Sequence, residues 1–121
     1  MMQEKKSGCI IAVSSGLSRS PGKGFIAHSS TKSALDAFVK SLALELGPDG
    51  IRVNAVAPGL TETDAIAFMP ENIKQMIAEH TPLKKNAQPE DIAGAILMMA
   101  SDQAQFITGA YIPVSGGSLM V

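Results

Sequence analysis

Three polar side chains stand at spacings that could support chemistry on one bound group. Ser15 lies two residues after a short apolar run, and His28 and Lys32 lie four residues apart where a helical pattern begins. Residues four apart on a helix share a face, so these two side chains could act on the same ligand. A serine at the end of a strand would meet them where open α/β sheets place their ligands. Such a set is suited to binding an oxygen atom and moving a proton.

Each of these residues also has a bland interpretation. From the residues alone, Ser15 is an ordinary serine of a strand-end loop, and its neighbour Ser14 is a second candidate of the same type. From the residues alone, Lys32 is likewise an ordinary surface lysine of a helix. The choice between the two interpretations depends on the elements that would position these side chains.

Glycine and proline residues divide the chain into segments that alternate between strand and helix periodicity. The strand Gly8–Val13 is a continuous apolar run, which predicts burial on both faces. This alternation favours an α/β fold with a parallel sheet, and residues 1–121 fit one domain. The predicted elements are strands at 8–13, 51–56 and 110–114 and helices at about 29–46, 71–79 and 89–100.

The longest predicted helix, from about Ser29 to Leu46, carries an apolar stripe at three- and four-residue spacing. Ser29 or Ser30 could cap its start, and Gly47-Pro48 ends it. The stripe consists of Ala34, Leu35, Phe38, Val39, Leu42 and Leu46.

Composition excludes several functional classes. Hydrophobic residues make up 45%, charged residues 17%, and the net charge is −1, so neither nucleic acid nor an anionic membrane is an expected partner. The longest apolar run, Ala95 to Ala100, is too short to span a bilayer. One cysteine, Cys9, cannot form an internal disulfide, and His28 and His80 lie too far apart in sequence for paired zinc ligands. We therefore expect a cytoplasmic protein without a metal.

Several longer segments carry a resemblance to a known family. They are His28-Ser-Ser-Thr-Lys-Ser-Ala-Leu35, Gly50-Ile-Arg-Val-Asn-Ala-Val-Ala-Pro-Gly-Leu-Thr-Glu-Thr63, Pro89-Glu-Asp-Ile-Ala93, Thr108-Gly109 and Gly116-Gly117. In this order they resemble the C-terminal half of the short-chain dehydrogenases/reductases, and within that family the 3-oxoacyl-(acyl-carrier-protein) reductases. Ser115 departs from the aspartate that usually precedes the closing glycines.

The resemblance implies the C-terminal part of a Rossmann-like, doubly wound parallel sheet, with about three strands and flanking helices. The family's earlier strands, and the glycine-rich turn that binds a pyrophosphate, have no counterpart in this sequence. The resemblance also implies NAD or NADP as cofactor and a small-molecule carbonyl or alcohol as substrate.

Roles carried over by position complete the expected site. Ser15, His28 and Lys32 occupy the catalytic positions, and Ser14 is the less favoured serine. The positions expected to face the cofactor are Lys32, Pro58, Gly59, Leu60, Thr63 and, less surely, Thr61.

His28 stands where the family has its catalytic tyrosine, and this changes the acid–base chemistry. A nearby ammonium favours the anionic form of a tyrosine but disfavours the cationic form of a histidine. Lys32 would therefore favour a neutral His28, which is a poor proton donor but a usable base. The only tyrosine, Tyr111, is expected to be a packing residue.

Two hypotheses follow. The first is an oxidoreductase chain, truncated or part of a split enzyme. The second is a non-catalytic interaction subunit, because the helix at 29–46 resembles one that packs against a sister subunit in the family. Both predict a homo-oligomer or a complementing partner chain, which would also cover the free edge of the first strand.

Overall fold

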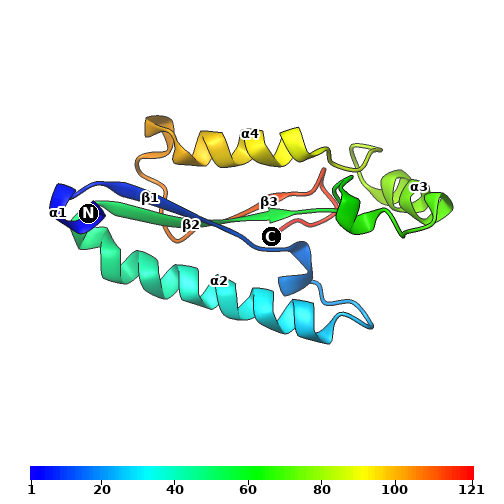
Figure 1. Ribbon diagram of the computed structural model, residues 1–121, viewed down its shortest axis with the longest axis horizontal. Helices are drawn as coiled ribbons and strands as arrows, with labels where there is room; N and C mark the ends of the chain where they lie inside the picture. Colours follow the sequence, from blue (N-terminus) through cyan, green and yellow to red (C-terminus); the bar gives the residue numbers. More distant parts are fainter.

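The central strand is the most deeply buried element of the molecule. In the computed structural model, which describes residues 1–121, β2 (Ile51–Pro58) lies between β1 (Gly8–Val13) and β3 (Tyr111–Val114). All three strands are parallel, in the order β1-β2-β3 (Figure 1). This confirms the predicted α/β fold with a partial, parallel Rossmann-like sheet.

β1 differs from its prediction in burial. Its residues Gly8 to Ala12 are half-buried, and Val13 is 46% exposed, so it is not covered on both faces. The reason is its position at the edge of the sheet, where no further strand pairs with its outer side. A continuous apolar run predicts the strand correctly but does not reveal which strands lie inside the sheet.

α2 (Ile26–Leu46) covers one face of the sheet and begins earlier than the sequence predicts. The Ser29 amide already donates to the carbonyl of Phe25 at 2.8 Å, so Ser29 lies inside the first turn. Phe25 occupies the N-cap position without a side-chain hydrogen bond, and the predicted serine cap is wrong. The earlier start places both His28 and Lys32 on the helix.

The buried side of α2 also differs from the predicted stripe. Phe38 is 57% exposed and Ala34 is exposed, whereas Asp36 is buried at 6% exposure. Val39 and Ala43 pack on the side chains of β2 that point towards this helix. The stripe is therefore rotated relative to the prediction and contains a carboxylate.

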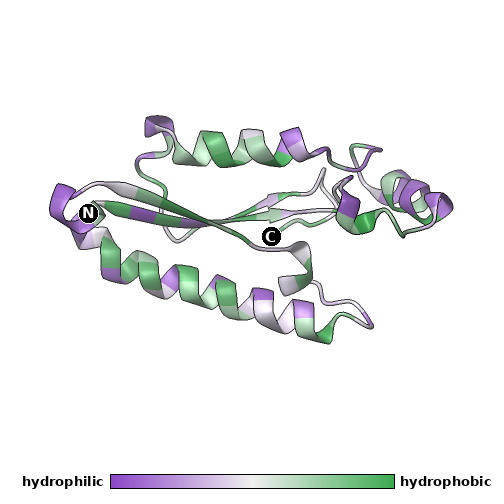
Figure 2. Ribbon diagram, viewed as in Figure 1, coloured by the Kyte–Doolittle hydropathy of each residue, from purple (hydrophilic) through white to green (hydrophobic).

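α4 (Pro89–Ala100) covers the opposite face of the sheet (Figure 1). Met99, at 1% exposure, packs with Ile92 and with Val56 of β2. Alternate residues of β2 thus point to α2 and to α4, as the period of a strand requires. Figure 2 shows that α4 is hydrophobic along most of its length.

The remaining elements are short or peripheral. α3 (Glu71–His80) lies beyond the carboxyl ends of the strands and is largely hydrophilic (Figures 1 and 2). None of the helices combines the length and the apolar character needed to cross a membrane. The other short elements are α1 (Met2–Lys5) and the 3₁₀ turns η1 (Gly16–Ser18), η2 (Gly47–Asp49), η3 (Asp64–Ile66) and η4 (Asp102–Ala104).

Candidate active site

The residues expected in the site lie together at the carboxyl end of the sheet. All three strands are parallel, so they end on this side, where Ser15 comes shortly after β1 and Pro58 ends β2. The first turns of α2, which carry His28 and Lys32, lie at the same end of the molecule (Figure 1). The structure thus brings together the segments that the resemblance singled out, while the chemical roles of these residues stay predictions.

Ser15 begins a tight turn at the end of β1. Its backbone is extended (φ −156°), and its Oγ accepts a hydrogen bond from the Leu17 amide at 3.2 Å. A hydroxyl that accepts one hydrogen bond still has its own proton to donate. Ser14, in contrast, is 4% exposed, and its hydroxyl donates to Asp36 at 2.5 Å. Ser14 is therefore engaged by the fold, whereas Ser15 can still donate to a ligand oxygen.

Lys32 and His28 lie one turn apart on α2. Nζ of Lys32 donates to the backbone carbonyl of Val13 at 2.6 Å, close to the serine turn in the chain. An ammonium group has three donors, so two remain for a ligand. His28 is exposed, and its ring lies edge-on to the ring of Phe25, with 6.5 Å between the ring centroids.

The loop after β2 is held tightly against the loop after β3. A Cβ atom at Gly59 would lie 2.9 Å from Cα of Ser115, so this close approach requires glycine. The Gly59 amide also donates to the carbonyl of Val114 at 2.9 Å. The Pro58-Gly59 pair consequently has a structural role in ending β2, whatever else it contacts.

Residues 60–63 differ in what they can offer a ligand. The Leu60 amide has no acceptor within the chain. Oγ1 of Thr61 donates to the carbonyl of Gly59 at 3.0 Å, so its proton is used in the loop. Thr63 is exposed, and its side chain does not cap the following turn, η3. The Leu60 amide and the Thr63 hydroxyl are thus among the donors that this loop leaves free.

A buried polar cluster behind the serine turn was missed by the sequence analysis. Asp36 accepts hydrogen bonds from the hydroxyls of Ser14 and Ser18, both at 2.5 Å, and lies 3.4 Å from Nε of Arg19. Tyr111 completes this Asp36 cluster, because its hydroxyl lies 3.3 Å from that of Ser18 and Arg19 lies over its ring at 4.5 Å. One signal for the cluster was available, namely a carboxylate on the apolar side of a helix, which requires partners when buried.

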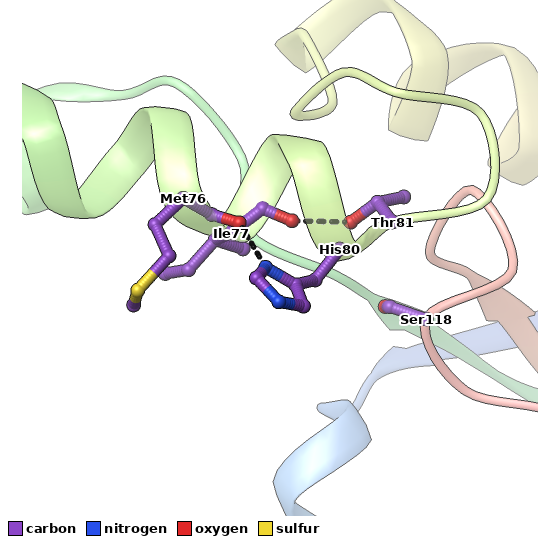
Figure 3. A pocket seen from close by; sticks show the side chains of 5 residues that line it. All are labelled: Met76, Ile77, His80, Thr81 and Ser118. Carbon is purple, nitrogen blue, oxygen red and sulfur yellow. Dashed lines mark hydrogen bonds between the residues drawn. The ribbon is translucent and has the colours of Figure 1, made fainter.

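A shallow pocket of about 380 Å³ adjoins the end of α3 (Figure 3). Met76, Ile77 and His80 line it from α3, Thr81 lines it directly after that helix, and Ser118 lines it from the loop after β3. Nδ1 of His80 lies 2.7 Å from the carbonyl of Met76, an acceptor, so Nδ1 carries the proton and Nε2 is left free. His80 is exposed, as the sequence analysis expected.

Glu62, in the loop after β2, forms an ion pair with Lys74 of α3. Hydrogen bonding from Asn86, at 2.9 Å, lowers the pKa of the Glu62 carboxyl group, and Lys74, at 3.3 Å, acts in the same direction. The ionised Glu62 is thus favoured in the folded chain, which strengthens the attachment of α3 near neutral pH.

Comparison with known proteins agrees with this architecture. Residues 1–118 match the protein family described as enoyl-(acyl carrier protein) reductase. The 3-oxoacyl-(acyl-carrier-protein) reductase of Aquifex aeolicus is 42% identical over 116 residues, which cover 96% of this chain and 47% of that protein. The crystal structure of 3-oxoacyl-(acyl-carrier protein) reductase from Brucella melitensis matches with a TM-score of 0.91 and 34% identity, covering 99% of this chain and 45% of that chain.

A second solved structure extends the comparison to a bound complex. A 7α-hydroxysteroid dehydrogenase complexed with NADH and 7-oxoglycochenodeoxycholic acid matches with a TM-score of 0.91 and 33% identity, covering 99% of this chain and 48% of that chain. The chain thus spans about half the length of the relatives it matches. The match is nearly complete over this chain in both sequence and structure. The chain therefore belongs to the short-chain dehydrogenase/reductase family and is similar to its 3-oxoacyl-(acyl-carrier-protein) reductases.

Proposed function

We propose that this chain forms the substrate-facing part of an NAD- or NADP-dependent oxidoreductase that interconverts a small-molecule carbonyl and its alcohol. The observation that carries the proposal is that Ser15, His28 and Lys32 lie at the same sheet edge as the Pro58–Thr63 loop. The relative that was solved with NADH and an oxo-steroid supports both the cofactor and the type of reacting group. The single thiol, Cys9, fits a reducing compartment such as the cytoplasm.

Ser15 and Lys32 would act on the reacting oxygen and the cofactor. The Ser15 hydroxyl retains its proton for a hydrogen bond to the substrate oxygen, because its Oγ already accepts from the Leu17 amide. Lys32 retains two donors beyond its bond to Val13 and would hold the cofactor ribose. Both groups are fixed by neighbouring backbone, so little reorganisation would be needed when a ligand binds.

The loop after β2 fits the nicotinamide end of the cofactor. The Leu60 amide and the Thr63 hydroxyl are free donors, and Pro58 and Gly59 set the close approach of the loop. Thr61 would support the loop through its bond to Gly59 rather than bind directly. When bound, the nicotinamide supplies or accepts the hydride.

His28 would handle the proton. A neutral imidazole can take the proton of an alcohol during oxidation, and an imidazolium can give a proton to a carbonyl oxygen during reduction. We propose that His28 takes up or gives this proton, since its exposed ring lies at the same end of the sheet as Ser15 and Lys32.

Cofactor titration tests the proposal directly. The chain is titrated with NADH and with NADPH up to millimolar concentration while nicotinamide fluorescence is recorded. Binding should occur for at least one cofactor and should weaken in Lys32→Met. Lys40→Met, an exposed lysine further along α2, is the matched control and should bind as the parent chain does. Undetectable binding at millimolar cofactor would reject the enzyme proposal for this chain.

Substitution of His28 tests the proton-transfer role. His28→Tyr should raise carbonyl reduction at pH 7, because it restores the proton-donating tyrosine that the family resemblance places at this position. His28→Phe, which keeps a ring without a titrating group, is the control and should give no gain. Equal rates for the tyrosine variant and the parent would refute this account of His28.

A second candidate function is a non-catalytic interaction subunit. The edge of β1 supports it, because this strand has no neighbour on its outer side and Val13 is 46% exposed. Under either function we propose a homo-oligomer or a complementing partner chain. Light scattering measures the mass in solution, and a monomer that binds cofactor would contradict the need for a partner.

A further inference from the structure

We propose that Asp36 and Tyr111 are positioning residues that hold the end of β1 so that the Ser15 hydroxyl faces a ligand as a donor. The inference rests on the proposed function for the chemical role of Ser15. It adds two residues that lie outside the motifs which carried the family resemblance. The geometry of the Asp36 cluster carries it.

Two side chains of α2 hold the end of β1. Lys32 donates to the carbonyl of Val13 at 2.6 Å, and Asp36 accepts from the hydroxyl of Ser14 at 2.5 Å. His28, Lys32 and Asp36 are spaced four residues apart, so they follow one side of the helix. The bond from Ser14 to Asp36 thus fixes the rotation of this side, and with it the position of His28, relative to the strand end.

Tyr111 holds Ser15 from β3. Its hydroxyl donates to the Ser15 carbonyl at 2.9 Å, and the Ser18 amide donates to the same carbonyl at 3.0 Å. The Leu17 amide donates to Oγ of Ser15 at 3.2 Å. With its carbonyl held from two sides and its Oγ held from one, Ser15 keeps its hydroxyl proton as the donor available to a ligand.

The buried carboxylate of Asp36 needs partners, and the turn after Ser15 supplies them. Asp36 is 6% exposed, and a buried carboxylate lowers stability unless it is paired and hydrogen-bonded. Ser18 and Arg19, both in the turn that follows Ser15, supply further partners. Arg19 also lies over the Tyr111 ring, so the turn contacts α2 and β3 at once.

Amide hydrogen exchange on the full chain tests the inference without a cofactor. Tyr111→Phe removes the donor to Ser15 and keeps the ring, so the Leu17 and Ser18 amides should exchange on the order of tenfold faster, the ratio expected for one lost hydrogen bond. The amides of β2 should not change. Asp36→Asn should act on the same two amides. Ser101→Ala, which removes a hydroxyl bond to the Met98 carbonyl far from the site, is the control and should leave both amides unchanged.

The outcomes separate positioning from general stabilisation. Faster exchange confined to the serine turn supports the inference. Unchanged exchange at Leu17 and Ser18 overturns it, and so does uniform acceleration of all slow amides, which indicates a purely stabilising cluster. If Asp36→Asn does not fold, Tyr111→Phe decides alone.

Turnover provides a second readout that is separable from the proposed function. In a chain that binds cofactor and turns over, Tyr111→Phe should lower kcat and leave KM unchanged, because the Ser15 donor acts on the developing charge of the oxygen. An unchanged kcat overturns the inference. Absent cofactor binding together with local acceleration at Leu17 rejects the proposed function and supports the positioning geometry.

Discussion

The two helices that cover the sheet bury different kinds of polar group. On the α4 face the buried polar side chain is Asn54, at 0% exposure, whose amide accepts from the Ala110 amide at 3.0 Å and donates to the Ile107 carbonyl at 2.9 Å. On the α2 face, besides the hydroxyls of Ser14 and Ser29, it is the carboxylate of Asp36, whose partners are side chains of the serine turn. Asn54 is neutral and forms hydrogen bonds with backbone groups, whereas Asp36 is a carboxylate and accepts hydrogen bonds from hydroxyls.

The α4 face, packed around Met99, forms an apolar layer. The α2 face, with the buried carboxylate of Asp36, forms a charged layer that supports the candidate site. Burying an amide that is hydrogen-bonded on both its oxygen and its nitrogen costs little, whereas burying a carboxylate is costly and is tolerated only with several partners. The costly group, Asp36, lies on the helix that also carries His28 and Lys32. The α4 face, which carries none of the expected catalytic residues, is filled by apolar side chains around Met99.

The largest effect should come from the apolar layer. Met99→Ala removes a side chain at 1% exposure and should lower the free energy of unfolding by about 3 kcal/mol, from lost burial and a residual cavity. Urea unfolding followed by circular dichroism measures the change. Its neighbour Met98, at 55% exposure, gives the control Met98→Ala, which should cost far less. Similar costs for the two variants would mean that the α4 face is not a packed layer.

The next effect concerns the charged layer. Asp36→Ala leaves the hydroxyls of Ser14 and Ser18 without their acceptor and should lower the free energy of unfolding by about 2 kcal/mol. Glu45→Ala, which removes an exposed acid from the same helix, should change it little. The same urea titration serves both. An equal loss in the free energy of unfolding for the two variants would contradict this prediction, because the buried carboxylate would then behave as a surface acid.

A smaller effect is expected where α4 ends. The guanidinium of Arg52 donates to the carbonyls of Met99 at 2.8 Å and Ser101 at 3.3 Å, so it satisfies the last turn of the helix. Arg52→Met should cost about 1 kcal/mol and speed amide exchange in that turn. Lys40→Met, an exposed cation on α2, is the control. If exchange in the last turn of α4 stays unchanged, Arg52 does not act as its cap.

The two layers also differ in how well the sequence predicts them. α4 was predicted at its observed bounds, because Pro89 at the first turn and the acids Glu90 and Asp91 mark its start. The start of α2 was misplaced, because Phe25 caps it without a side-chain bond and no local signal marks it. The start of a helix is therefore predicted from sequence only where nearby residues, such as a proline or acids in the first turn, mark it.

The candidate site shows the same limit. The placement of Ser15 and Lys32 followed from motifs of nearby residues and from the end of a strand. The Asp36 cluster joins Ser18 to Tyr111 across 93 positions of sequence, and no local pattern predicts such a contact. The exposure of Val13 was missed for a similar reason, since it depends on which strand lies beside β1.

The smallest expected effect is the acid dependence of stability that two surface ion pairs, Lys6–Asp49 and Lys74–Glu62, contribute. Hydrogen bonding from Lys6, and then from Gln3, lowers the pKa of Asp49 below its usual 3.8. Asn86 and Lys74 lower the pKa of Glu62 below its usual 4.5. Both groups bind a proton more readily when the chain is unfolded, so their contribution is complete above these usual values and is lost as the pH falls below them.

Unfolding midpoints at a series of pH values down to 3 measure this loss. Asp49→Asn should flatten the acid dependence through the contact of η2 with Lys6, at the amino end of the sheet, and Glu62→Gln should flatten it through α3, at the carboxyl end. Each change should be small, because both pairs lie at the surface and are screened by salt. If the acid dependence persists undiminished in the double variant, the two surface contacts of Asp49 and Glu62 do not contribute to it.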